Sequence, residues 1–183
     1  MKRILAAGLV MLLLTGCNQQ TVQEPMKLRT KLYEKACSFR AVVDADYGEV
    51  IYQFAMDCQA DTAGNLKFQV VTPESISGIT GTISEEKGNL TFDEKILAFP
   101  VISEGQVTPV TAPWHLLHTL RSGYIAGCGQ DENYTRVMLD DSFSENPLHL
   151  DCWLDQDENP VRGEILYKGR RILTVHIEKF RFL

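Results

Sequence analysis

Residues 37–58 read CSFRAVVDADYGEVIYQFAMDC, and this stretch decides the fold. Its middle, from Asp46 to Glu49, is a turn in which Gly48 can adopt positive φ. Folding about Tyr47 and Gly48 places apolar residues opposite one another on one face: Ala45 with Val50, Val43 with Tyr52, Ala41 with Phe54, Phe39 with Met56, and Cys37 with Cys58. The other face pairs mostly polar residues, as in a sheet with one buried side. The pattern predicts an antiparallel hairpin in this register.

Further alternating stretches extend this sheet along the chain. We expect strands at residues 66–71, 79–84, 90–93, 96–99, 134–139, 148–154, 161–167 and 171–180. The last two should form a hairpin centred on Gly169. That centre places Ile165 opposite Leu173 and Gly163 opposite Val175, and it implies a three-residue loop.

Two helices are expected among the strands. A loose apolar spacing over residues 26–36 indicates a short amphipathic helix. A second helix runs from Pro113 to Gly123 and places Trp114, Leu117 and Leu120 on one face. The sequence therefore predicts a mainly β (α+β) fold, in which a strongly curved antiparallel sheet encloses a mid-chain helix.

The start of the chain has the features of an export signal. Lys2 and Arg3 precede an apolar run over residues 4–14, which is too short to span a bilayer comfortably. The following Leu14-Thr15-Gly16-Cys17 resembles the bacterial lipoprotein signal, and an ordinary signal peptide that ends at a cysteine is the alternative. The resemblance implies acylation of Cys17 and a chain anchored by lipid at the extracytoplasmic face of the cell membrane. We expect a signal peptide at 1–16, a polar, disordered tether at 17–25 and a single domain at 26–183.

Composition and motifs argue against several classes of function. The 183 residues carry a formal net charge of −6 and contain no basic cluster, so we expect no nucleic-acid partner. Motifs of nucleotide binding and of hydrolase or metalloprotease catalysis are missing, so we expect neither enzymatic activity nor a cofactor. His115 and His118 could share a metal, but a solvated helix edge is the better interpretation. Asp155 opens a calcium-like stretch that Pro160 interrupts, which favours an acidic hairpin turn.

Four cysteines remain after Cys17, in a compartment that permits disulfides. The hairpin register places Cys37 opposite Cys58, so we predict a bridge there. Cys128 and Cys152 are then paired by elimination, and four buried free thiols are the alternative. Gly127, Cys128 and Gly129 together suggest a turn.

Three stretches, taken in their order and spacing, resemble the lipoprotein-carrier family of LolA and LolB. They are residues 72–79 (TPESISGI), the helix 113–123, and the ending NPVRGEI (159–165) with ILTVHIEKFRF (172–182). The same pattern resembles the lipoproteins of spore germination that share this fold. The resemblance implies an incomplete β-barrel whose apolar concave face is covered by helices and can hold acyl chains, in proteins that are not enzymes.

The resemblance also implies a ligand site on the inner face of the first hairpin and on the helical lid. The residues concerned are Phe39, Val43, Tyr52, Phe54, Met56, Trp114, Leu117 and Leu120. Trp153 should lie on the opposite face of its strand. Two functions remain open: binding of acyl chains or lipoproteins, and a lipidated scaffold that docks a cell-envelope enzyme such as a cell-wall amidase.

Overall fold

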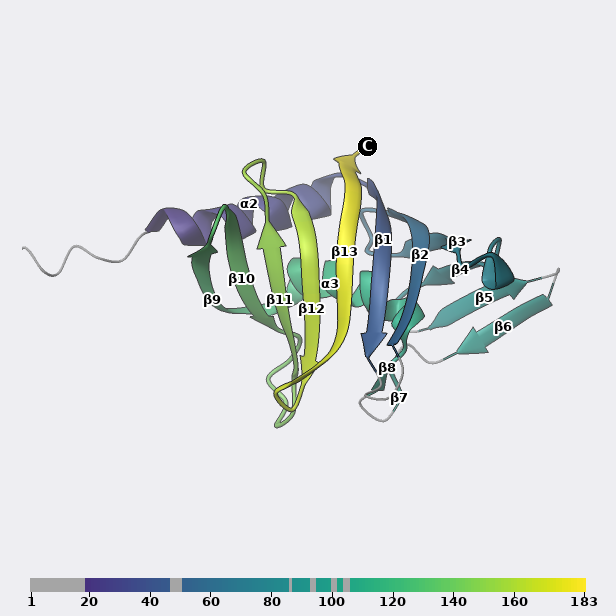
Figure 1. Cartoon of the computed structure of the whole chain (residues 1–183). Helices are drawn as coiled ribbons and strands as arrows, with labels where there is room; N and C mark the ends of the chain where they lie inside the picture. Colours follow the sequence, from purple (N-terminus) through teal and green to yellow (C-terminus); the bar gives the residue numbers. More distant parts are fainter. Residues whose placement is uncertain (1–18, 47–50, 86, 93–94, 100–101, 104–105) are drawn as a thin grey trace, which may run out of the picture.

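The computed structural model describes residues 19–46, 51–85, 87–92, 95–99, 102–103 and 106–183 (Figure 1). Within these ranges, eleven strands form one antiparallel sheet in the order β6-β5-β4-β3-β2-β1-β13-β12-β11-β10-β9. The strands are β1 (Cys37–Asp46), β2 (Ile51–Ala60), β3 (Leu66–Thr72), β4 (Thr80–Ile83), β5 (Gly88–Phe92), β6 (Lys95–Phe99), β9 (Tyr124–Asp131), β10 (Tyr134–Asp140), β11 (Leu148–Leu154), β12 (Pro160–Tyr167) and β13 (Arg170–Phe182).

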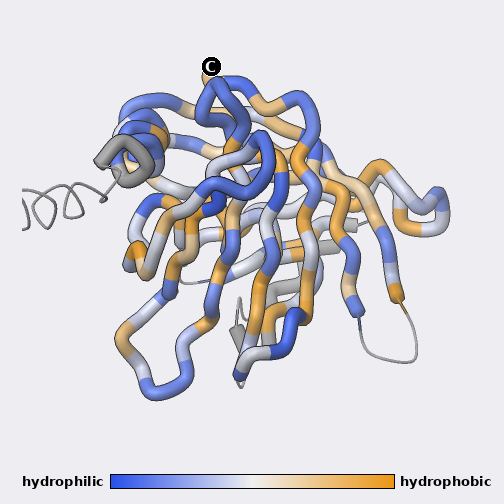
Figure 2. The backbone as a smooth tube through the Cα atoms, turned by 60° about the vertical axis from the view of Figure 1, so that its left-hand side comes forward, coloured by the Kyte–Doolittle hydropathy of each residue, from blue (hydrophilic) through white to orange (hydrophobic). Residues whose placement is uncertain are grey.

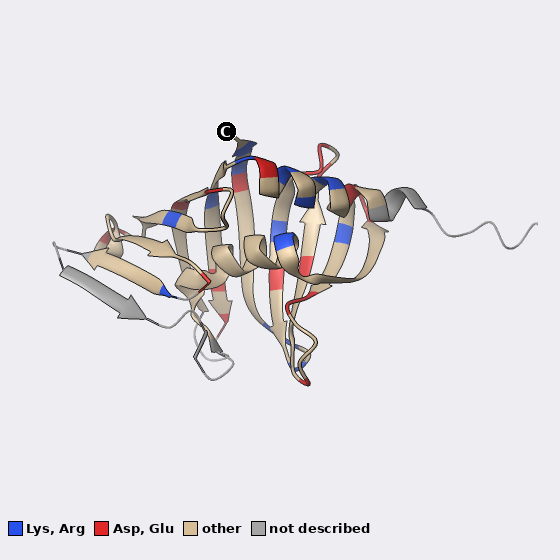
Figure 3. Cartoon of the chain, turned by 180° about the vertical axis from the view of Figure 1, so that it is seen from behind, with Lys and Arg blue, Asp and Glu red and all other residues tan. Residues whose placement is uncertain are grey.

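Helices cover one face of this curved sheet. α3 (Ala112–Ser122) lies across its concave side, and α2 (Gln19–Glu34) runs along one rim (Figures 1 and 3). The smaller elements are the 3-10 turns η1 (Glu74–Ile76) and η2 (Pro109–Thr111) and the short strands β7 (Ile102–Ser103) and β8 (Gln106–Val107). This architecture confirms the prediction of a mainly β fold with a curved antiparallel sheet around a mid-chain helix.

The first and last strands of the chain meet in the middle of the sheet. β1 pairs with β13 through contacts such as Val43 with Val175 and Ala41 with Ile177. Burial alternates along β1, so that every second side chain lies under the helices. The same alternation of hydrophobic and hydrophilic residues is visible along the neighbouring strands in Figure 2. The core is therefore built from one face of this sheet and from the helices that cover it.

The predicted hairpin exists, but its register was wrong by two residues. Ala45 lies opposite Tyr52, Ala41 opposite Met56 and Phe39 opposite Cys58. The last pair before the connection is Asp46 with Ile51, so four residues, 47–50, separate the strands and lie outside the described ranges, as does the expected partner Val50. A shift of two preserves the face of every side chain, which explains why the polarity match survived the error.

The C-terminal hairpin confirms most of its prediction. Ile165 lies opposite Leu173 and Gly163 opposite Val175. The prediction of a three-residue loop was wrong, because the register shifts by one residue between Ile165 and Leu166. The connection is therefore the two residues Lys168 and Gly169, both with positive φ as a tight hairpin turn requires.

The N-terminal helix begins earlier than expected. α2 starts at Gln19 and contains Pro25, so residues 19–24 are helical instead of a disordered tether. Tertiary contacts account for the extension, since Pro25 is buried and Glu24 accepts a hydrogen bond from Thr135 of β10. Cys17 and the signal segment lie outside the described residues. Among the helices that the structure describes, none has the length and hydropathy needed to cross a membrane.

Strand β9 was missed by the sequence analysis. The expected turn at Gly127, Cys128 and Gly129 was wrong, because all three lie in this edge strand. A Cβ at Gly127 would lie 2.7 Å from the Met138 side chain, so the glycine allows close packing of β9 on β10.

Candidate functional site

The concave face gathers most of the residues predicted to bind a ligand. Six are buried, namely Phe39, Val43, Met56, Trp114, Leu117 and Leu120, and Phe54 is half-buried. Tyr52 lies on the same face of β2 as Phe54 and Met56, opposite Ala45, but it is 57% exposed. β3 pairs with β2 only from Ala55 onward, so the neighbouring strand that would shelter Tyr52 is missing there.

α3 is buried on nearly every side because the sheet curls around it. Leu116 is completely buried and packs on Gly163 of β12, where a Cβ would lie 2.6 Å from a Leu116 methyl. The expectation that His115 lies on a solvated edge was wrong, since only 4% of this residue is exposed. His118 is half-buried and stacks on Trp114, with ring centroids 4.5 Å apart. Gly123 ends the helix as predicted, and its amide donates a hydrogen bond to the Thr119 carbonyl.

Two arginines fasten the helices to each other. Arg29 of α2 donates from Nε to the Leu120 carbonyl (2.9 Å) and from Nη2 to the Gly123 carbonyl (2.7 Å). In return, Arg121 of α3 donates to the Leu32 carbonyl (3.0 Å). Each guanidinium thus satisfies carbonyls at the C-terminal end of the other helix, where a cation is favoured. Figure 3 shows Lys and Arg along α2 and near the end of α3.

A small cavity lies between the sheet and the helices α2 and α3, which together form the lid. The cavity bounded by Leu32, Cys37, Leu66, Trp114 and Leu117 measures about 10 Å³. Ion pairs from Lys27 and Lys31 of α2 to Glu158, at 3.0 and 2.9 Å, hold the rim of the lid to the β11–β12 turn. In this conformation the described residues of the concave face pack with those of α2 and α3 in one core cluster.

The four cysteines within the described residues are free, so the predicted disulfides are not formed. Cys37 lies opposite Ala60 and Cys58 opposite Phe39, so the two thiols are diagonal neighbours instead of a directly opposed pair. Cys128 and Cys152 both flank Val137, on either side of β10. Two strand spacings, about 9.5 Å, separate them, which is too far for a bridge.

Burial changes the chemistry of these thiols. Loss of solvent raises the pKa of Cys37 to about 11 and raises the pKa values of Cys58 and Cys152 well above the usual range. The three thiols stay protonated near neutral pH and are poor nucleophiles.

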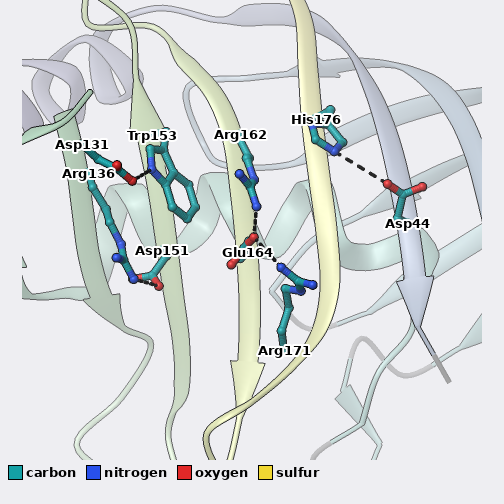
Figure 4. Close-up of polar contacts among 9 residues, drawn as sticks. All are labelled: Asp44, Asp131, Arg136, Asp151, Trp153, Arg162, Glu164, Arg171 and His176. Atoms are coloured by element: carbon teal, nitrogen blue, oxygen red, sulfur yellow. Dashed lines mark hydrogen bonds and ion pairs between the residues drawn. The ribbon is translucent and has the colours of Figure 1, made fainter. Parts of the chain in front are cut away.

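The convex face carries a ladder of polar contacts (Figure 4). The Glu164 carboxylate forms ion pairs with Arg162 and Arg171. Arg136 Nη2 lies 2.5 Å from Asp151 Oδ2 in a further ion pair. The hydrogen bond to the Asp151 carboxylate is the main reason that the pKa of Arg136 is raised. Further along, His176 lies 3.7 Å from Asp44.

Trp153 is the unexpected member of this face. It lies on the other face of β11 from Leu150 and Leu154, as predicted, yet it is only 8% exposed. The guanidinium groups of Arg136 and Arg162 lie 5.3 and 4.6 Å from its ring, and its Nε1 donates to Asp131 at 2.7 Å. Both arginines are the direct cross-strand partners of Trp153, so correct pairing of β10, β11 and β12 would have revealed the cluster from sequence. A cavity of about 400 Å³ lies beside it.

A larger hollow lies on the open side of α3, and we call it the α3 pocket. Its volume is about 740 Å³, and it is lined by Tyr33, Ala63, Gly64, Asn65, Ser84, Glu85, Trp114, His118, Arg121, Ser122, Tyr124 and Asp141. The Ser122 hydroxyl lies 3.4 Å from His118 Nε2 but donates to the His118 carbonyl at 2.9 Å. That bond occupies the hydroxyl proton, so the pair is not arranged as a nucleophile with its base.

Metal ligands do not converge anywhere in the part of the chain that the structure describes. His115 is buried, whereas His118, one turn further along α3, lines the α3 pocket. Asp155 forms the acidic turn that was predicted, because its Oδ1 accepts hydrogen bonds from the amides of Asp157 and Asn159.

Comparison with known proteins identifies the fold alone. No family model and no curated protein matches the chain. Among solved structures, an uncharacterized conserved protein from Thermus thermophilus is similar, with 14% identity and a TM-score of 0.51 over 90% of this chain and 88% of that one.

Two further structures have lower TM-scores. A LolA superfamily protein from Nitrosomonas europaea has 6% identity and a TM-score of 0.46 over 87% of this chain and 93% of that one. The complex of the CwlD amidase with the GerS lipoprotein from Clostridioides difficile contains a chain with 13% identity and a TM-score of 0.46, over 92% of this chain and 98% of that one.

Proposed function

We propose that this chain is a lipid-anchored docking protein of the cell envelope, without enzymatic activity, held at the extracytoplasmic face of the membrane through Cys17. The observation that carries the docking role is the filled concave face. A cavity of about 10 Å³ lies between the lid and the sheet. A ligand of the size of a C14–C16 acyl chain needs a site of at least about 300 Å³. Carriage of an acyl chain between the lid and the sheet would therefore require a different conformation from the one described.

Opening the lid would break several contacts at once. The hydrogen bonds that Arg29 donates to Leu120 and Gly123 join α2 to α3, and Lys27 and Lys31 pair with Glu158. Hydrogen bonds from charged groups contribute about 1.5–3 kcal/mol each where they are shielded from water. Leu28 and Leu32 of α2 would also lose their burial. These costs favour a permanent cover over a lid that opens to admit a ligand.

Binding of acyl chains or lipoproteins is the competing function, and purification from native membranes separates the two. Mass spectrometry of the purified full chain should detect bound protein but no noncovalent lipid at stoichiometric amount. Stoichiometric fatty acid, phospholipid or acylated peptide would contradict the docking role and support a carrier.

The anchor is tested separately. Cys17→Ala should release the protein from membranes or leave it as an unprocessed precursor, because the acyl chains supply the membrane affinity. Mass spectrometry should show a diacylglyceryl group on Cys17 of the native protein. An unmodified Cys17 would contradict the anchor while leaving the docking role to be judged by the first experiment.

A further inference from the structure

The α3 pocket is a built hollow with a rigid floor. Trp114 is held by a hydrogen bond from its Nε1 to the Gly64 carbonyl (3.0 Å), and His118 stacks on it. Gly64 has φ of +91°, a conformation that other residues rarely adopt, so the β2–β3 turn is shaped to meet the indole. The floor therefore does not depend on a ligand for its order.

One wall of the pocket is a cation, Arg121, that donates to three backbone carbonyls. Arg121 donates to the carbonyls of Leu32, Asp61 and Thr62, and its guanidinium lies 4.5 Å from the centre of the Tyr33 ring. Through these contacts Arg121 links α3 to α2 and to the β2–β3 turn. Three of its five N–H groups are thus occupied within the protein.

Exposed aromatic rings form the rim. Tyr33 is 50% exposed and Tyr124 is 43% exposed, and both line the pocket. Phe143, in the β10–β11 connection, is 82% exposed and stacks against Tyr124 with ring centroids 3.5 Å apart. Aromatic residues gathered at a hollow on an otherwise polar surface are typical of protein interfaces.

Carboxylates dominate the charge of the pocket. Glu85 and Asp141 lie among the lining residues, and Asp141 is fixed by bonds to its Oδ1 from the Leu148 amide (2.9 Å) and the Ser142 hydroxyl (3.0 Å). Desolvation lowers the pKa of His118, so its ring is uncharged near neutral pH. Two carboxylates against one guanidinium leave the lining with a net negative charge, so the pocket favours a cationic ligand.

We propose that the α3 pocket receives a Lys- or Arg-bearing segment of the docked partner protein. Carboxylates from two elements and an aromatic rim together suit a cation, because an ammonium or guanidinium can pair with the acids while lying over the rings. The acidic net charge of −6 favours approach of a basic segment. This inference rests on the docking function and names where the partner binds and with what chemistry.

The test uses the full chain with Cys17→Ala, labelled with ¹⁵N, and an acetylated, amidated peptide of alternating Lys and Ser. Chemical shifts should change for the amides of Glu85 and Tyr124 and for the Trp114 indole. Glu85→Gln and Phe143→Ala should each weaken binding about two- to fivefold. Glu132→Gln, which removes an exposed acid beside Trp153 on the convex face, should leave the affinity within about a factor of two.

Matched peptides decide whether the site is selective. A Glu/Ser peptide of the same length should not bind. Equal binding of the two peptides, equal weakening by Glu132→Gln, or shifts confined to other surfaces would overturn the inference. A glucosamine oligosaccharide that shifts the pocket residues more strongly than the Lys/Ser peptide would also overturn it, in favour of a glycan site.

The same labelled protein keeps this result separate from the docking function. Palmitate that enters the core would shift the amides of Met56 and Leu116, which are completely buried on the concave side. That outcome would contradict the docking function. Only the peptide titration tests whether the α3 pocket binds a basic segment.

Discussion

The two faces of the same sheet bury large side chains in different ways. On the concave face, apolar residues such as Val43 and Val175 are completely covered because α2 and α3 form a second layer over them. On the convex face, Trp153 is 8% exposed although it lies on the side of the sheet away from α3. The arginines of neighbouring strands cover it with their stems and guanidinium planes, as long charged side chains can. A sheet face without a helical layer can thus still build a compact cluster.

The comparison indicates which face tolerates change. The concave side is a close-packed core, in which a lost methylene leaves a void. The convex side is built from ion pairs between half-exposed arginines and largely buried carboxylates, and water can partly replace the arginine contacts. We therefore expect substitutions on the concave face to affect stability more than those on the convex face.

Leu116→Ala should have the largest effect. Leu116 is completely buried between α3 and Gly163, so its truncation should lower the free energy of unfolding by about 2–5 kcal/mol. Urea denaturation measures the change, with Met138→Ala on the convex face as the control, expected to cost about 1 kcal/mol or less. Equal losses for the two variants would show that the faces are not packed differently.

Trp153→Phe should cost less, about 1–2 kcal/mol, because it keeps an aromatic ring between the arginines and removes the hydrogen bond to Asp131. Asp131→Asn is the matched variant, since it keeps an acceptor but removes the charge, and it should cost less than Trp153→Phe. A loss as large as that of Leu116→Ala would mean that the convex cluster is a second core.

Arg29→Lys tests the fastening of the lid. A lysine can reach only one of the carbonyls of Leu120 and Gly123, so we expect a loss of about 1 kcal/mol. Amide hydrogen exchange should accelerate in α2 and in the last turn of α3, and Arg170→Lys at the exposed start of β13 should leave exchange unchanged. Unchanged exchange in Arg29→Lys would show that packing alone holds the lid.

The smallest effect concerns acid pH at the rim of the lid. Burial opposes ionisation of Glu158, but hydrogen bonds from Lys31 and Lys27 outweigh it and hold the pKa below the ordinary 4.5. The stabilisation is therefore complete above about pH 4.5 and is lost as the pH falls through the lowered value. Because both lysines are exposed, Glu158→Gln should reduce the difference in stability between neutral and acid pH by only about 0.5–1 kcal/mol. An identical pH profile in the variant would contradict this contribution.

Local patterns in the sequence were sufficient to predict much of the fold. The two hairpins, α3 with its end at Gly123, and the inward faces of β1 and β11 follow from alternation and helical spacing, because each depends on residues close in the chain. The register of β1 on β2 failed because it depends on the connection at 47–50, whose length polarity alone does not fix. Strand β9 was not predicted, because its glycines are as typical of a turn as of a strand that packs closely on Met138.

The candidate site was harder to predict because it depends on tertiary coverage. Phe39, Met56 and Trp114 were placed correctly on the concave face, whereas the exposure of Tyr52 depends on where β3 stops pairing. The α3 pocket joins Tyr33, Glu85 and Asp141, which lie far apart in the sequence. No periodicity could bring them together. The burial of Trp153 likewise required knowledge of which strands flank β11.

The central claim is that the concave face is filled, and the emission of Trp114 tests it most directly. The chain contains two tryptophans, so the Cys17→Ala, Trp153→Phe protein reports from Trp114 alone, which is 4% exposed and lies against the lid cavity. Titration with palmitate below its critical micelle concentration should leave the emission maximum and intensity unchanged. A saturable shift with one palmitate bound per chain, accompanied by shifts of the Met56 and Leu116 amides, would contradict the account and identify the protein as an acyl-chain carrier.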